Sequence, residues 1–215
     1  KKQDMKLKSF CRASLAALFG AAIFAAVPDQ AYSQIRVNTD RSLGSDIHVV
    51  TPALKRVNFS ADDQDFTGLY MDHASLMLEK GKPALPFMSG MIMIAQDQKP
   101  VLEVIKTRFT EISVKKPVVP SRGAILRSVD PSTVPFKQGA VYKKNAWFPA
   151  DNDIIRISQP FIFREARGVR LEVFPVQYNP ATGKIRLYTS IQAKLKYDGQ
   201  GGANIHRGRS ELSRA

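Results

Sequence analysis

The chain has 215 residues, of which 44% are hydrophobic and 24% charged, so it is neither wholly disordered nor collagen-like. Lysine and arginine outnumber aspartate and glutamate by 32 to 19, for a formal net charge of +13, and the length fits one domain with a tail. One cysteine, Cys11, excludes an internal disulfide, and three histidines far apart in the sequence offer little for a metal site. We therefore expect no metal and no cofactor.

The N-terminus has the three-part layout of a secretory signal peptide. Basic residues around Met5 precede the uncharged, mainly apolar stretch 13–27, which ends near the small residues of Ala31-Tyr32-Ser33. This stretch is shorter than the roughly 20 residues that a membrane-spanning helix needs. We predict a signal peptide over residues 1–33, cleaved after Ser33, and no stable membrane insertion afterwards.

Cleavage after Ser33 would remove Cys11, so the mature chain could not be a cysteine-dependent enzyme. An exported chain without disulfides is more typical of a bacterial envelope protein than of a small eukaryotic secreted domain. We expect a secreted, periplasmic or cell-envelope protein of a bacterium.

The body of the chain predicts strands and no convincing helix. From residue 47 to 197, apolar residues alternate with polar ones more often than they recur at helical spacing. Short strands are expected at 47–50, 57–59, 66–71, 74–78, 91–94, 101–105, 111–114, 154–157, 161–163 and 169–173.

The clearest element is a long hairpin near the C-terminus. After the connector 179–183, which supplies Pro180 and Gly183 for a turn, positions 185 to 197 alternate between an apolar and a polar face. The apolar face is expected to carry Ile185, Leu187, Thr189, Ile191, Ala193, Leu195 and Tyr197. The pattern predicts an all-β fold, a single jelly-roll-like β-sandwich with a long C-terminal hairpin.

Composition divides the chain into four expected segments. The signal peptide is followed by an N-terminal arm (34–50), a sandwich domain (51–198) and a flexible basic tail (199–215) that starts with a glycine-rich spacer. Within the sandwich, residues 115–150 are rich in proline, lysine and glycine, and loops of such length are usually functional or mobile.

Motifs for catalysis or ligand binding are weak. The acidic clusters at 62–65 and 151–153 lack the spacing of a calcium loop, and neither a phosphate-binding glycine loop nor a nucleophile elbow is present. Trp147 is better explained as a core residue than as a ligand platform. The basic residues are spread along the chain, which favours a solvated surface over a nucleic-acid site and leaves open the steering of an acidic protein partner.

Several blocks of residues occur in a fixed order between about residues 81 and 198. They are Gly81-Lys82-Pro83-Ala84-Leu85-Pro86; Pro120-Ser121-Arg122-Gly123-Ala124-Ile125-Leu126-Arg127 with Asp130-Pro131 and Val134-Pro135; Phe148-Pro149; Pro160-Phe161-Ile162-Phe163-Arg164 with Arg167-Gly168; and Phe174-Pro175-Val176-Gln177-Tyr178-Asn179-Pro180 with Leu187-Tyr188-Thr189. In order and spacing, this set resembles the N-terminal propeptide of gingipain-type secreted cysteine peptidases.

The resemblance implies a non-catalytic, all-β propeptide that assists the folding of a peptidase and keeps it latent. It also implies that Arg127, flanked by Arg122, Gly123, Leu126 and Ser128, enters the primary specificity pocket of the peptidase as a pseudosubstrate. A guanidinium can meet a carboxylate in such a pocket through paired, charge-assisted hydrogen bonds. Processing sites are expected at Ser33 and at Arg207, Arg209 and Arg214.

The family pattern would continue into a peptidase domain, which this sequence lacks. The chain could be a propeptide cut from a longer precursor, acting in cis, or a stand-alone homologue that acts in trans. Two other functions stay open: a secreted β-sandwich binding or adhesion module without a protease partner, and a basic binder of nucleic acid or another polyanion. We expect the peptidase as partner and no nucleic acid.

Overall fold

The computed structural model describes residues 34–40 and 44–205. The predicted signal peptide (1–33) with its cleavage site at Ser33, and the predicted processing sites Arg207, Arg209 and Arg214, lie outside the described residues.

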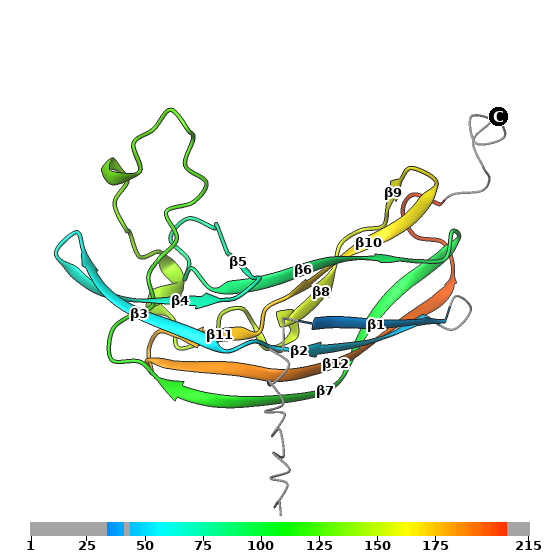
Figure 1. Cartoon of the computed structure of the whole chain (residues 1–215), viewed down its shortest axis with the longest axis horizontal. Coiled ribbons are helices and arrows are strands. Elements are labelled where there is room, and N and C mark those ends of the chain that lie inside the picture. Colours follow the sequence, from blue (N-terminus) through cyan, green and yellow to red (C-terminus); the bar gives the residue numbers. More distant parts are fainter. Residues whose placement is uncertain (1–33, 41–43, 206–215) are drawn as a thin grey trace, which may run out of the picture. The chain divides into compact units, whose positions relative to one another are not determined.

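Strands form two five-stranded antiparallel sheets and a separate hairpin (Figure 1). The first sheet contains β1 (Gln34–Asp40), β2 (Gly44–Val50), β7 (Gln98–Ser113), β11 (Val176–Asn179) and β12 (Lys184–Gln200). The second contains β5 (Ser75–Leu76), β6 (Pro86–Met93), β8 (Ile155–Ile157), β9 (Phe161–Phe163) and β10 (Ala166–Val173). The hairpin pairs β3 (Leu54–Ala61) with β4 (Gln64–Met71), and three short 3-10 helices, η1 (Pro131–Thr133), η2 (Ala140–Lys143) and η3 (Asp151–Asp153), lie in the long connection after β7.

The main core lies between the two sheets, which confirms the predicted β-sandwich. β2 and β12 contribute side chains such as Val49 and Ile191, while β6 and β10 contribute Ile92, Val169 and Leu171; each of these is at most 4% exposed. Full burial of one such side chain is worth roughly 1.5–3 kcal/mol, so this shared interior is the main force that holds the sheets together.

A second apolar cluster lies toward the β3–β4 hairpin. It joins Leu69 of β4 to Val118, Phe174 and Tyr178, and the hydroxyl of Tyr142 donates a 2.6 Å hydrogen bond to the Val118 carbonyl. Burial raises the pKa of Tyr142, so this phenol remains a hydrogen-bond donor. The start of the long connection after β7 is therefore packed into the interior.

Residues 34–40 and 44–50 pair into the first sheet of the sandwich, so these strands do not form a separate arm. β2 pairs with β12 from Ser190↔Val50 to Leu195↔Ser45, and β1 pairs with β2 along its whole length. Ile47 and Val49 are buried in the main core. The composition of this segment does not reveal its role, because its pairing partner is almost 150 residues away in the sequence.

The predicted long hairpin is confirmed, with one correction to its apolar face. β11 and β12 pair from Asn179↔Lys184 onward, but the pairing of β12 with β7 shifts between Tyr188 and Ser190. This irregularity places Tyr188 in the core, at 4% exposure, and leaves Thr189 exposed, contrary to the simple alternation.

The start of the predicted flexible tail is docked on the domain. The side chain of Arg167 is fully buried and donates hydrogen bonds to the carbonyls of Ala95, Gln98, Gly201 and Ala203, the shortest being 2.6 Å to Gln98. Gly202 has a φ of +88°, and a Cβ there would lie 3.1 Å from the Arg167 guanidinium. Gly202 therefore allows a close approach to Arg167, and the segment up to Ala203, whose carbonyl accepts from Arg167, is not a free spacer.

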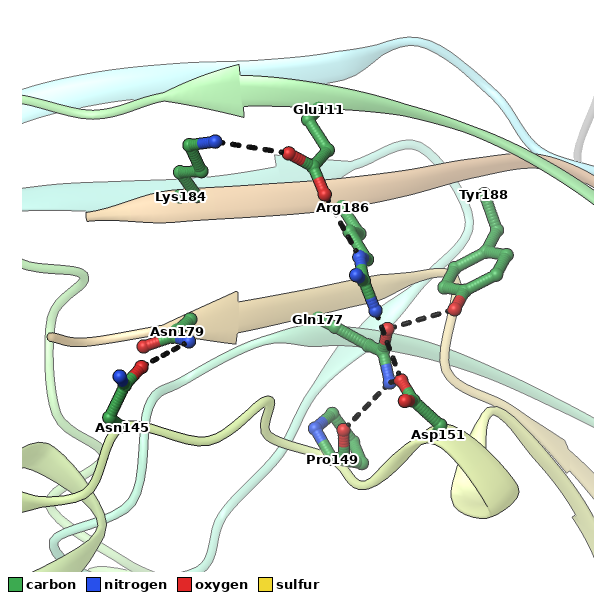
Figure 2. Close-up of polar contacts among 9 residues, drawn as sticks. All are labelled: Glu111, Asn145, Pro149, Asp151, Gln177, Asn179, Lys184, Arg186 and Tyr188. Atoms are coloured by element: carbon green, nitrogen blue, oxygen red, sulfur yellow. Dashed lines mark hydrogen bonds and ion pairs between the residues drawn. The ribbon is translucent and has the colours of Figure 1, made fainter. Parts of the chain in front are cut away.

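A polar network holds residues 145–151 against the hairpin (Figure 2). The amide of the buried Gln177 donates to the Pro149 carbonyl and to the Asp151 carboxylate, and its oxygen accepts from the Tyr188 hydroxyl at 2.8 Å. Arg186 bridges Asp151 to Glu111 of β7, and its hydrogen bond lowers the pKa of the Glu111 carboxyl. These contacts fix the chain between η2 and β8.

Candidate functional site

The candidate site is a loop, residues 122–135, whose first end is fixed to the domain by backbone hydrogen bonds. Val119 N–H donates to the Thr67 carbonyl at 3.0 Å, and Ser121 N–H donates to the Lys82 carbonyl at 2.8 Å. Val119 and Ser121 are both buried. The loop therefore begins from a rigid position beside β4.

The second end of the loop is fixed by an aromatic anchor. The ring of Phe136 packs against Phe59 and Phe66 of the β3–β4 hairpin, with centroid distances of 6.1 and 5.8 Å. The Phe136 N–H also donates a 2.6 Å hydrogen bond to the Asp62 carboxylate in the turn of that hairpin. Between its two fixed ends, the loop extends away from the sheets in Figure 1.

A tight turn forms the outer part of the loop. The Val129 N–H donates to the Leu126 carbonyl at 3.0 Å, so Arg127 and Ser128 occupy the two central positions. Arg127 is exposed and has no hydrogen bond, ion pair or ring contact with the described residues. Leu126 is 72% exposed, the highest value among the large apolar side chains of the described residues.

Asp130 caps the short helix that follows this turn. Its carboxylate accepts a 2.9 Å hydrogen bond from the Ser132 N–H, which lowers the pKa of the carboxyl, and Pro131 occupies the first helical position. Aspartate before proline at the start of a helix is a common N-cap pattern, and it is the signal by which the sequence alone could have revealed this ordered element.

The structure places all five predicted loop residues in this one segment, in different environments. Gly123 has a φ of +84° and lies against the Lys80 side chain, so a larger residue would be strained there. Leu126, Arg127 and Ser128 are exposed, whereas Arg122 is half-buried and turned back toward the end of the loop. The sequence predicted neither the contacts of Arg122 across the loop nor the anchoring of Phe136, because both depend on residues that are distant in the sequence or meet only when the loop closes.

Trp147 does not form an open binding platform. The Arg186 guanidinium stacks on the Trp147 ring, 3.9 Å from its centroid, and the tryptophan is half-buried. A cleft of about 310 Å³ lies beside it, lined in part by Lys82, Phe148 and Phe174. Trp147 therefore holds the Arg186 guanidinium on its ring and also lines part of this cleft.

Residues 34–40 and 44–205 contain neither a metal-binding group of side chains nor a membrane-spanning helix. In that part of the chain, no three His, Cys, Asp or Glu side chains come together in a group that could hold a metal ion. In the same ranges, no helix has the length and apolar character needed to cross a membrane.

The all-β fold agrees with the family to which the chain is similar. A family model described as Propeptide_C25 matches residues 26–210, and the chain therefore belongs to this family of propeptides. This assignment makes it a non-catalytic propeptide domain and supports the resemblance seen in the sequence.

Relatives of known identity are gingipains of Porphyromonas gingivalis. The chain is 32% identical to Gingipain R1 over 166 residues, which cover 71% of this chain and 16% of that protein. It is 31% identical to Gingipain R2 over 164 residues, which cover 71% of this chain and 22% of that protein. The chain thus spans less than a quarter of the length of these relatives.

Two solved structures share the fold. The complex of the pro- and mature domains of RgpB from Porphyromonas gingivalis matches with a TM-score of 0.75 and 25% identity, covering 84% of this chain and 92% of that chain. A structure that concerns the zymogenic latency of gingipain K matches with a TM-score of 0.68 and 18% identity, covering 80% and 96%. The second match shows the fold alone.

Proposed function

We propose that this domain keeps a gingipain-type cysteine peptidase latent by placing Arg127 in its primary specificity pocket, and that it assists the folding of that peptidase. The observation that carries the proposal is the position of Arg127, which is exposed, without a partner among the described residues, in the outer turn of a loop that is anchored at both ends. The likeness to a structure of pro- and mature domains in complex supports a peptidase as the partner.

The physical argument rests on pre-organisation. A loop that is already ordered loses less conformational freedom on binding than a flexible one, so more of the contact energy remains as affinity. In a pocket closed by a carboxylate, the guanidinium of Arg127 would make two parallel charge-assisted hydrogen bonds. The turn closed by Leu126 and Val129 holds the backbone around Arg127 in a bent form.

The proposal includes export of the protein across the bacterial inner membrane. The signal-peptide layout of residues 1–33 motivates this part, and a secreted peptidase partner requires it. The expected destination is the periplasm, the cell envelope or the exterior.

The test is a titration of an arginine-specific gingipain-type peptidase with the full chain and its variants. Removal of a hydrogen-bonded charge from a buried interface pair costs about 2–5 kcal/mol, so Arg127→Ala should weaken inhibition by roughly 30-fold to several thousand-fold. Arg127→Lys should recover only part of the inhibition, because an ammonium cannot make the forked contact. Arg170→Ala is the matched control, since Arg170 is exposed on β10, outside the loop.

Thermal melts of the same variants separate binding from folding. Arg127→Ala should melt like the wild type because the side chain has no described partner. If wild type and Arg127→Ala inhibit equally, Arg127 does not occupy the pocket.

A further inference from the structure

Arg122 connects the two ends of the loop that carries Arg127. Its Nη1 donates hydrogen bonds to the carbonyls of Pro131, at 2.5 Å, and Val134, at 3.3 Å. These acceptors lie nine and twelve residues further along the chain, on the return side of the loop. One side chain therefore closes the loop across its base.

The same guanidinium is stacked on the aromatic anchor. Its central carbon lies 4.5 Å from the centroid of the Phe136 ring. That ring in turn packs on Phe59 and on Phe66, which is fully buried. Arg122 is thus tied both to the returning backbone of the loop and to the apolar cluster beneath it.

Without Arg122, the outer loop would be held to the domain by fewer contacts. Within the part of the chain that the structure describes, the turn at Leu126–Val129 and the cap at Asp130 are hydrogen-bonded only inside the loop itself. The nearest backbone hydrogen bonds to the rest of the domain are those of Ser121 and of Phe136. A longer free segment has more conformations to lose on binding.

We propose that Arg122 is a positioning residue, which holds the loop in the form that presents Arg127 and thereby sets the strength of inhibition. This inference rests on the proposed function of Arg127. It also changes the role expected from the sequence, where Arg122 is only a flanking residue. An arginine suits the role because its planar group can stack on a ring and donate to carbonyls at once, whereas a lysine ammonium cannot do both equally well.

The expected effect follows from the fraction of time that the loop spends in its binding form. The apparent dissociation constant is the intrinsic one divided by this fraction, so a loop that is competent about one tenth of the time binds about tenfold more weakly. We expect Arg122→Ala to lower this fraction to about one tenth and so to weaken inhibition about tenfold, less than Arg127→Ala, although Arg122 itself does not enter the pocket.

The experiment combines inhibition with hydrogen exchange of the free protein. Full-length wild type, Arg122→Ala, Arg122→Lys and the exposed control Arg170→Ala are titrated against an arginine-specific gingipain-type peptidase. Amide exchange of peptides that cover residues 123–134 is measured in parallel without peptidase. We expect faster exchange and weaker inhibition for Arg122→Ala, intermediate values for Arg122→Lys, and wild-type values for Arg170→Ala.

A double variant tests whether Arg122 acts through Arg127. If it does, adding Arg122→Ala to Arg127→Ala should cause little further loss of inhibition, because the two effects are coupled. Additive losses would overturn the inference and assign Arg122 its own contact with the peptidase. Unchanged exchange and inhibition in Arg122→Ala would also overturn it.

The outcomes separate this inference from the proposed function. If Arg127→Ala inhibits like the wild type, the pocket role fails, and with it the positioning role, even where Arg122→Ala speeds exchange in the loop. If Arg127→Ala weakens inhibition and Arg122→Ala does not, the pocket role stands and the positioning role is wrong. Arg122→Lys serves as the deciding variant if Arg122→Ala lowers the melting temperature of the whole domain.

Discussion

At the scale of single residues, Arg167 combines full burial with a positive charge. A buried cation is unfavourable unless its donors are satisfied, and the guanidinium meets this need with four backbone carbonyls from two separate segments. Burial lowers the pKa of Arg167, whose ordinary value is so high that the group stays charged. The residue links the β6–β7 turn to the segment after β12.

Replacement of Arg167 should therefore destabilise the domain. Arg167→Met keeps much of the side-chain volume but leaves up to four carbonyls without donors, and one such buried group costs about 1–3 kcal/mol. We expect the free energy of unfolding in urea to fall by about 2–4 kcal/mol. Arg170→Met, at an exposed position of the same strand, is the control. Equal losses in the two variants would contradict the linking role of Arg167.

Asp130 offers a test of the loop structure that depends on pH. Its folded-state pKa is lowered by the hydrogen bond from the Ser132 N–H, so the cap stabilises the loop above the unfolded pKa and is lost as the pH falls through the folded value. In an NMR titration, the Ser132 amide resonance should move with a midpoint below the ordinary pKa of an aspartate. Asp130→Asn should abolish the titration. A midpoint at or above the ordinary value would show that the cap does not form in solution.

The sequence was enough to predict the environment of some single residues but not of others. The exposure of Arg127 could be expected from a proline-bounded loop between strands. The burial of Arg167 could not, because a charged residue in a strand normally faces solvent and its acceptors, such as the Gln98 and Ala203 carbonyls, lie 69 and 36 residues away. Arg122 was predicted as a flanking residue of the loop, but its contacts with Pro131, Val134 and Phe136 were missed, because they form only when the loop closes.

At the scale of elements, the alternation of residues 185–197 was enough to predict the long hairpin. Local turn chemistry at Pro180 and Gly183 and a period of two are both encoded within a short stretch. The register shift at Thr189 is not encoded in this way, because it arises from the pairing of β12 with β7. A strict alternation therefore placed Thr189 in the core and Tyr188 outside, and the structure reverses both.

The hairpin leads to a prediction about Ile191, which is fully buried between the sheets. Ile191→Ala should lower the free energy of unfolding by about 2–5 kcal/mol, because it removes buried surface and leaves a cavity. Gln192→Ala, at the exposed neighbouring position, should stay within about 0.5 kcal/mol of the wild type. Chemical denaturation of the three proteins checks this. Similar midpoints for all three would mean that the β12 register is wrong.

At the scale of the whole molecule, the order of motifs was more informative than any single motif. Blocks spread over more than a hundred residues predicted the propeptide family, which the family match confirms. The pairing of β2 with β12 was not predicted, because hydrophobic patterns and turn residues indicate pairing only between strands that follow each other in the sequence. The predicted N-terminal arm thus supplies two strands of the sandwich, β1 and β2.

The role of β1 sharpens the prediction about export. β1 begins at Gln34, whose pairing partner is Val50, so cleavage after Ser33 would leave this strand complete. We expect the exported protein to begin at or near Gln34, because small residues at positions 31 and 33 suit a signal peptidase. Intact-mass analysis and N-terminal sequencing of the exported protein measure this directly.

A paired variant makes the export test specific. Ser33→Trp should block or slow cleavage, because a bulky side chain does not fit where a small residue is required, and the precursor should accumulate. Ser45→Thr, at a residue of β2 away from the cleavage site, is processed like the wild type if the effect is local. An exported wild-type protein that keeps residues 1–33 would refute the signal peptide. A start well inside β1 would show that processing removes part of the first sheet, and the melting temperature should then fall, because β2 would lose its partner along one edge.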